Sequence, residues 1–211
     1  ANKLLVTGAT PSGDPDGVGP EFARHIADGL GVPVSYVQFP TPGELADAVT
    51  ENVWDIGLIG AEPTRAEKIA FTAAYVEIEA TYLVPEGSPL NTIEDVDAEG
   101  VRIAVSGRSA YDLYLSRSLK HAELHRAQGL PGALELFMAE KMDALAGLRP
   151  ALTGDLDKVP GGRILDGQFT AVQQAVGTAR TKPEAAAYLS DVVEDAKASG
   201  LIARLIEKHK V

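Results

Sequence analysis

Two arginines stand just beyond short apolar runs, and this placement suggests anion binding. Arg65 follows the run at 56–60 after a four-residue break, and Arg149 directly follows the run at 142–148. A guanidinium is a permanent cation whose planar fork matches a carboxylate with two hydrogen bonds. In open parallel sheets, ligands bind beyond the carboxyl ends of the strands. The alternative interpretations involve no ligand: Arg65 forms a surface ion pair with Glu62 or Glu67, and Arg149 is an exposed helix-end residue.

Polar groups near these arginines complete the predicted site. Gly60 ends the first apolar run and Glu62 follows it, while Thr64 and Glu67 are typical of a capping box at a short helix. In the second half, the sequence runs from a predicted strand through a turn into a helix at Ser109, Ala110 and Tyr111. A hydroxyl and free N–H groups at a helix start can bind an anion, although Ser109 is equally suited to cap the helix.

A pattern of short strands alternating with helices occurs twice and must position these residues. The first copy has predicted strands at 3–6, 33–39 and 54–60, and the second has strands at 101–105, 122–127 and 142–148. Amphipathic helices lie between them, so each copy predicts a parallel β-sheet with flanking helices. Extended segments at 76–84 and 168–178 bracket the second copy, and a final helical region follows.

This bracketing predicts an α/β fold of two lobes joined by two hinge strands. Lobe 1 is expected to comprise residues 1–82 and 175–211, and lobe 2 residues 83–174. Both arginines are then expected to face one cleft between the lobes, and a ligand that touches both lobes should favour a closed form.

Composition excludes several classes of function. The chain has 211 residues, a net charge of −11 and no cysteine. The negative charge disfavours nucleic acid and anionic membranes, and no apolar run is long enough to span a bilayer. The four histidines lack metal-site spacing, and the glycine-rich stretch at 8–13 does not lead directly into a helix, so neither a metal nor a nucleotide cofactor is expected. The chain starts at Ala1, which is typical of a processed or trimmed end, and we expect a monomer.

The order of several motifs resembles a known protein family. The motifs are "GVGPEFARHIADGLG", "WDIGLIG", "TRAEKIAFTAAY", "VDAEGVRIAVSGRSAYD" and "ASGLIARLIEKH". Together they resemble the bacterial extracellular solute-binding proteins of the polar amino acid type, family 3. The resemblance implies a two-lobe, type II periplasmic binding protein-like fold. It also implies a non-enzymatic receptor, periplasmic or extracellular and lipid-tethered, that delivers its ligand to the membrane permease of an ABC importer.

The resemblance also assigns roles to residues. Arg65 lies six residues before Phe71, the position at which the family's arginine holds the ligand's carboxylate. The turn at Ser109, Ala110 and Tyr111 resembles the one that binds the same carboxylate from the second lobe, although Ala110 stands where a second hydroxyl is common.

Two departures from the family pattern bear on the ligand. Leu148 or Arg149 stands where an acidic residue usually pairs with the ligand's ammonium, and the loop at 7–19 lacks a stacking aromatic. A small organic anion without an ammonium fits this pattern better than an ordinary amino acid. Glu62, Asp14 or Asp16 can still supply a negative partner for an ammonium, so an amino acid remains a candidate ligand. The alternatives are a cyclohexadienyl dehydratase-like lyase on the same scaffold, or the ligand-sensing domain of a larger membrane receptor.

Overall fold

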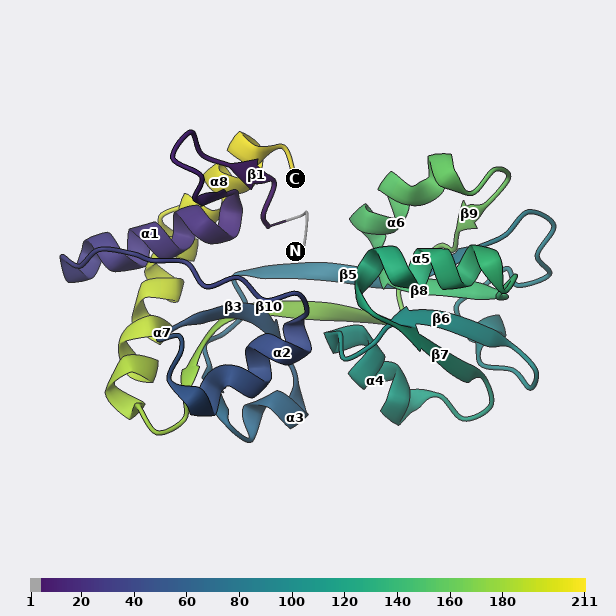
Figure 1. Ribbon diagram of the computed structural model, residues 1–211, viewed down its shortest axis with the longest axis horizontal. Coiled ribbons are helices and arrows are strands. Elements are labelled where there is room, and N and C mark those ends of the chain that lie inside the picture. The colour runs from purple at the N-terminus through teal and green to yellow at the C-terminus, as the bar shows by residue number, and fades with distance from the viewer. Residues whose placement is uncertain (1–4) are drawn as a thin grey trace. The chain divides into compact units, whose positions relative to one another are not determined.

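The computed structural model describes residues 5–211, which form two compact units (Figure 1). Unit 1 contains the chain up to Val76 together with Gln173–Val211, and unit 2 is Glu77–Val172. The chain therefore passes from one unit to the other twice, at residues 76–77 and 172–173. The lobe boundaries expected from the sequence lie a few residues from these points, and the assignment of the two units as hinged lobes stays a prediction.

Unit 1 is built from helices and two antiparallel groups of strands. One group is the separate two-stranded sheet of β1 (Gly8–Ala9) and β2 (Pro15–Asp16). The other is formed by β3 (Gly57–Ala61), β4 (Ile69–Phe71) and most of β10 (Thr170–Ala179). Its helices are α1 (Val18–Leu30), α2 (Pro42–Asp47), the 3₁₀ helix η1 (Ala48–Glu51), α3 (Pro63–Ala66), α7 (Pro183–Ala198) and α8 (Leu201–His209). Helix α8 packs against both α1 and α7, so the C-terminal helices belong with the N-terminal part of the chain.

The parallel sheet predicted for the first copy of the pattern is wrong. Strand β10 pairs antiparallel with β3, with Gln174 opposite Gly60, and antiparallel with β4. Residues 33–39 form no strand, and Val34 and Val37 are exposed. β-Branched residues favour a strand because they pack well on a half-buried, pleated surface. Such a surface exists only where the segment pairs with a neighbouring strand. Of the strand predicted at 3–6, residues 3 and 4 lie outside the described residues, and residues 5 and 6 are not in a strand.

The helices predicted in unit 1 form, for the expected reasons. Helix α1 buries Phe22 and Ile26 and ends at Gly31, whose φ of 65° suits glycine. Helix α2 has Pro42 in its first turn, and the Thr41 hydroxyl accepts a hydrogen bond from the Glu44 N–H at 3.2 Å. These local signals fix the two helices that precede β3.

Unit 2 follows the predicted pattern closely. Strands β6 (Arg102–Ser106), β7 (Glu123–Ala127) and β8 (Ala144–Leu148) form a parallel sheet with β6 in the middle. Strand β5 (Val76–Val84) joins β8 antiparallel, and the short β9 (Arg163–Ile164) pairs with β5. The helices are α4 (Ala110–Ser118), α5 (Gly129–Ala139), α6 (Arg149–Asp155) and the 3₁₀ turns η2 (Glu94–Val96) and η3 (Leu156–Lys158). The predicted parallel sheet is therefore confirmed in this unit.

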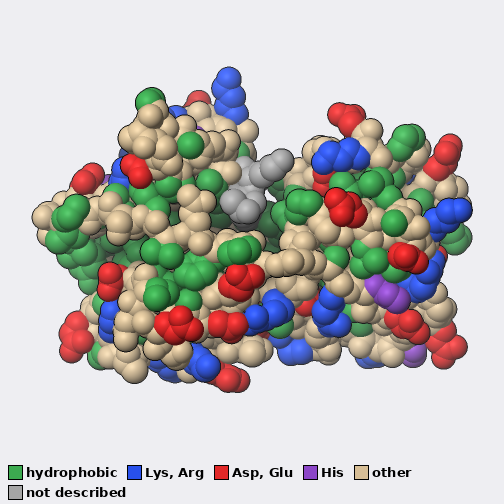
Figure 2. Space-filling model, viewed as in Figure 1, with side chains coloured by type: hydrophobic (Ala, Val, Ile, Leu, Met, Phe, Trp, Pro, Cys, Tyr) green, Lys and Arg blue, Asp and Glu red, His purple; other side chains and the backbone are tan. Residues whose placement is uncertain are grey.

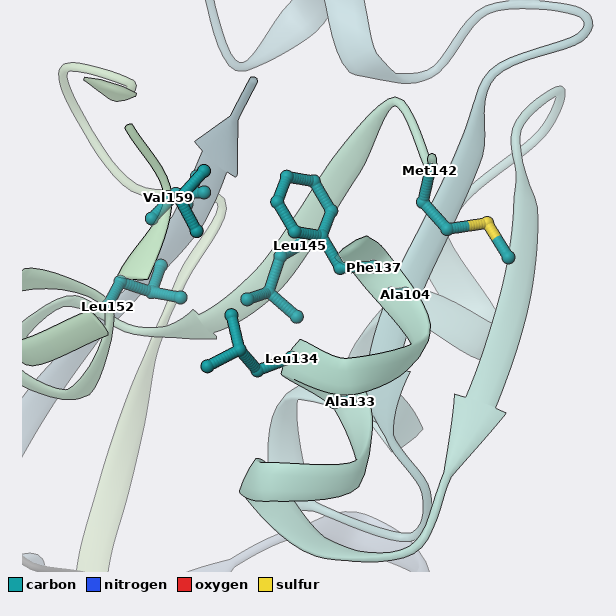
Figure 3. Packing of buried hydrophobic residues seen from close by; sticks show 9 residues of the cluster. Ala104, Ala133, Leu134, Phe137, Met142, Leu145, Leu152 and Val159 are labelled. Atoms are coloured by element: carbon teal, nitrogen blue, oxygen red, sulfur yellow. The ribbon is translucent and has the colours of Figure 1, made fainter. Parts of the chain in front are cut away.

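The core of unit 2 lies between α5 and the sheet. Phe137 is only 3% exposed and packs with Leu134, Leu145 and Met142 (Figure 3). Strand β8 is buried along its whole length, which is typical of a strand covered on both faces. This core supports the ends of β6 and β8, where two groups of predicted site residues begin.

None of the helices within residues 5–211 has the length and apolar character needed to cross a bilayer. On the face shown in Figure 2, acidic and basic side chains of the described residues are interspersed.

Asp97 anchors the loop that follows α4. Its Oδ1 accepts hydrogen bonds from the N–H groups of His121 at 2.8 Å and Ala122 at 3.1 Å, and both of its oxygens accept from Lys120. Burial alone raises the pKa of this carboxyl, but the three backbone donors and His121 together hold the pKa below its ordinary value. The charged form is therefore the one that the fold favours.

We expect Asp97→Asn to make the free energy of unfolding depend less on pH under acidic conditions. Because the folded pKa of Asp97 is lowered, its contribution is present above the unfolded value, about 3.9, and is lost as the pH falls through the folded pKa. Urea unfolding at a series of pH values from about 6 downward checks this. The parent should lose more stability than the variant below about pH 4. If the free energy of unfolding falls equally with pH in both proteins, the role given to Asp97 is wrong.

Candidate functional site

The end of β3 brings three of the predicted site residues together. Glu62 leaves the strand in an extended conformation and caps α3, because its Oε2 accepts a hydrogen bond from the Thr64 N–H at 2.9 Å. Pro63 then occupies the first helical turn, where its missing N–H costs nothing. The predicted capping box of Thr64 and Glu67 is therefore wrong: the cap lies two residues earlier, and Glu67 ends the helix.

Arg65 is buried where β3 ends. Its side chain donates from Nη1 to the Gly60 carbonyl at 2.7 Å, and the residue is only 6% exposed. This exposure rules out the interpretation of Arg65 as a solvated surface charge. A buried guanidinium is costly unless charged or polar groups compensate it, and the Gly60 carbonyl is one such group. Glu62 is buried as well, which puts a carboxylate three residues before the cation.

The turn between β6 and α4 holds the second predicted group. Ser109 is the N-cap of α4, and its Oγ accepts a hydrogen bond from the Asp112 N–H at 3.1 Å. The predicted capping role is therefore confirmed. A hydroxyl that accepts one hydrogen bond still has a proton to donate, so Ser109 can cap the helix and also act as a donor. Arg108 precedes it in the left-handed conformation, with a φ of 62°.

The first turn of α4 adds backbone donors. Ala110 and Tyr111 are the first two residues of this nine-residue helix. N–H groups at these positions have no intrahelical acceptor, and the helix dipole makes them attractive to negative charge. The Tyr111 side chain is buried, and burial raises the pKa of its hydroxyl to about 12, more than the neighbouring Ser109 and Ser106 hydroxyls lower it. Tyr111 therefore stays neutral at physiological pH.

Arg149 has a structural role within unit 2. It is the first residue of α6, and its Nε donates to Glu79 Oε2 at 2.5 Å. Its Nη2 donates to the carbonyls of Gly167 and Leu165. These bonds tie α6 to β5 and to the segment after β9. Glu79 balances the charge of Arg149. The ligand-binding role expected of Arg149 from the sequence stays a prediction.

A further cluster lies away from the predicted residues, in unit 1. Carboxylate oxygens of Asp16 and Glu21 and a ring nitrogen of His209 all lie within 4.8 Å of one another. Glu21 Oε1 already pairs with His209 Nε2 at 2.7 Å and with Lys208 Nζ at 2.6 Å. These contacts attach α8 to α1, which gives the cluster a structural function. Sequence analysis missed it because the partners are almost the whole chain apart.

Comparison with protein families gives one match over nearly the whole chain. The model of the bacterial extracellular solute-binding proteins, family 3, matches residues 7–210. Comparison with curated proteins gives no match.

Solved structures share the fold of this chain. The amino acid ABC transporter substrate-binding protein AbpA from Streptococcus pneumoniae, bound to L-arginine, has a TM-score of 0.78 at 20% identity, covering 98% of this chain and 89% of its own. The P235GK mutant of ArgBP from T. maritima has a TM-score of 0.77 at 21% identity, covering 95% of this chain and 87% of its own. The ancestral amino acid-binding protein AncCDT-1, a precursor of cyclohexadienyl dehydratase, has a TM-score of 0.77 at 20% identity, covering 95% and 88%. The predicted periplasmic binding protein-like fold is thereby confirmed.

Proposed function

Because the chain belongs to the bacterial extracellular solute-binding proteins, family 3, we propose that it binds one small carboxylate-bearing solute, an organic anion or an amino acid, and delivers it to the permease of an ABC importer. It does so outside the cytoplasm, in the periplasm or tethered to the outer face of the membrane, and as a monomer. The observation that carries the binding proposal is the buried guanidinium of Arg65, held at the end of β3 by the Gly60 carbonyl.

The ligand group that fits this site is a carboxylate. Arg65 offers a preoriented fork, and charge-assisted bonds to a carboxylate are among the strongest that a side chain makes. The Ser109 hydroxyl and the first-turn N–H groups of Ala110 and Tyr111 offer further donors on unit 2. We propose that these donors bind an anionic group of the ligand.

The buried carboxylate of Glu62 keeps amino acids among the candidate ligands. It lies three residues before Arg65, and an α-amino acid presents a carboxylate and an ammonium close together. A buried carboxylate and a buried cation at the end of the same strand suit such a zwitterion. An anion without an ammonium remains the competing class, because Leu148 and Arg149 supply no acidic partner.

A small panel distinguishes the two ligand classes. We expect L-arginine, L-glutamine, L-glutamate or the ammonium-free dicarboxylate succinate to bind with a stoichiometry of one in calorimetric titration. At a hundredfold excess over its Kd, a ligand that binds only the folded chain stabilises it by about 2.7 kcal/mol, which also raises the melting temperature. Binding of succinate alone supports the ammonium-free class, and binding of the amino acids alone supports a zwitterion. A panel without any binder contradicts the proposed ligand chemistry.

An enzyme on this scaffold is the second candidate, favoured by the similarity to AncCDT-1. A dehydratase needs a positioned acid or base beside the substrate. Glu62 is the carboxylate that lies with Arg65, whereas Tyr111 stays protonated at neutral pH because burial raises its pKa to about 12. Because the chain belongs to a family of solute-binding proteins, we propose binding without turnover as the first candidate. Conversion of prephenate or arogenate, followed by absorbance, would establish the enzyme instead.

A further inference from the structure

A buried carboxylate lies beneath the turn that precedes α4. The Asp112 side chain is only 3% exposed, and its Oδ2 accepts a hydrogen bond from the Arg108 N–H at 2.7 Å. The Asp112 N–H in turn donates to Ser109 Oγ at 3.1 Å. One residue therefore holds both the backbone before Ser109 and the hydroxyl of Ser109 itself.

The turn needs this support because its conformation is unfavourable. Arg108 has a φ of 62°, a region that residues other than glycine rarely adopt. Such a conformation persists when its surroundings fix it. The bond from the Arg108 N–H to a carboxylate is charge-assisted and short, so it favours this conformation over the extended one.

A second strand fixes the carboxylate. Arg126 on β7 donates from Nε to Asp112 Oδ1 at 3.0 Å and Oδ2 at 3.2 Å, and from Nη2 to Ser116 Oγ at 2.8 Å. The Ser116 hydroxyl donates to the Asp112 carbonyl at 2.7 Å. Asp112 is thereby tied to β7 and to the next turn of α4, both of which belong to unit 2.

We propose that Asp112, clamped by Arg126, is the positioning residue of the anion site: it sets the turn so that the Ser109 hydroxyl and the first-turn N–H groups of α4 are preoriented for the ligand. This inference rests on the proposed function, in which those groups bind the ligand. Asp112 itself does not contact the anion, since a carboxylate would repel it. Its effect on affinity comes from preorganisation, because donors that are already ordered lose less entropy on binding.

The first test needs no ligand. Asp112→Asn keeps the shape of the side chain but replaces one acceptor oxygen with an NH₂ group, which can only donate. Hydrogen exchange followed by mass spectrometry should show about tenfold faster exchange for peptides covering 106–111, as expected from the loss of a charge-assisted bond. Asp97→Asn is the matched control, because Asp97 also binds backbone N–H groups of unit 2 but organises the loop at 120–122. It should speed exchange there and leave 106–111 unchanged.

The second test measures affinity for whichever panel compound binds the parent. Asp112→Asn should weaken binding about tenfold at 25 °C, and Asp97→Asn should leave it unchanged although both variants lose stability. The Arg126 side chain is 48% exposed, so Arg126→Gln removes the clamp without emptying a buried position. This variant should also weaken binding. Equal affinity losses for Asp112→Asn and Asp97→Asn would show a general stability effect and overturn the positioning role.

The outcomes separate this inference from the proposed function. Faster exchange at 106–111 with unchanged affinity shows that Asp112 orders the turn but that the turn does not bind the ligand, which overturns the inference while Arg65 can still bind. Unchanged exchange at 106–111 also overturns it. If no panel compound binds the parent, the proposed ligand chemistry fails, whatever the exchange result.

Discussion

Arg65→Ala is expected to weaken ligand binding by about 30- to 5,000-fold. Truncating one partner of a buried, hydrogen-bonded charge pair costs about 2–5 kcal/mol, and each 1.4 kcal/mol is a factor of ten in Kd. Arg65 is buried beside the Gly60 carbonyl, so water cannot replace the lost guanidinium well. Arg65→Lys should recover only part of the affinity, because an ammonium keeps the charge but loses the planar fork.

Calorimetric titration of the parent and both variants checks this, with Arg24→Ala as control. Arg24 is a partly buried arginine of unit 1 that binds Asp16 and Tyr36 instead of the site, so its removal should leave Kd unchanged. Arg65→Ala also loses the bond to Gly60, which costs about 1.5–3 kcal/mol of stability, so each titration needs a thermal melt beside it. A folded Arg65→Ala variant that binds like the parent would show that the site is misplaced.

Phe137→Ala is expected to lower the free energy of unfolding by about 3–5 kcal/mol. The residue is buried between α5 and the sheet of unit 2, and removing an aromatic ring there leaves a cavity that Leu134, Leu145 and Met142 cannot fill completely (Figure 3). Urea unfolding followed by circular dichroism measures the loss.

The adjacent residue provides the control for this change. Met138 lies on the same helix but is 44% exposed, so Met138→Ala should change stability by no more than about 0.5 kcal/mol. Similar losses for the two variants would mean that α5 presents a different face to the sheet. Because Phe137 lies in the core and not in the proposed site, its variant should bind the ligand normally at temperatures where it is folded.

Local sequence signals predicted most helices and the sheet of unit 2. Helical spacing at Phe22 and Ile26, and the Thr41 cap, depend on residues within a few positions of one another, so they can be recognised without the fold. Unit 2 alternates strands and helices in chain order, which makes neighbouring strands pair in parallel. In unit 1 the partner of β3 is β10, more than a hundred residues away, and the local pattern contains no sign of it.

In the candidate site, too, contacts between residues close in the sequence were predicted, and contacts between distant residues were not. Gly60, Glu62 and Arg65 lie within six residues, so the strand end predicted their proximity. Arg149 was expected near a ligand, but its partner Glu79 is 70 positions away and could not be identified from spacing. The clamp of Asp112 by Arg126 was missed for a similar reason, because it depends on the pairing of β6 with β7.

The proposed function requires that Arg65 holds the carboxylate of a bound small molecule. Native mass spectrometry tests this on the purified parent and Arg65→Ala, each incubated with the panel and compared with its denatured mass. We predict that the parent carries one adduct with the mass of a carboxylate-bearing compound and that Arg65→Ala carries none under the same conditions. An adduct held at equal occupancy by both proteins would contradict the claim.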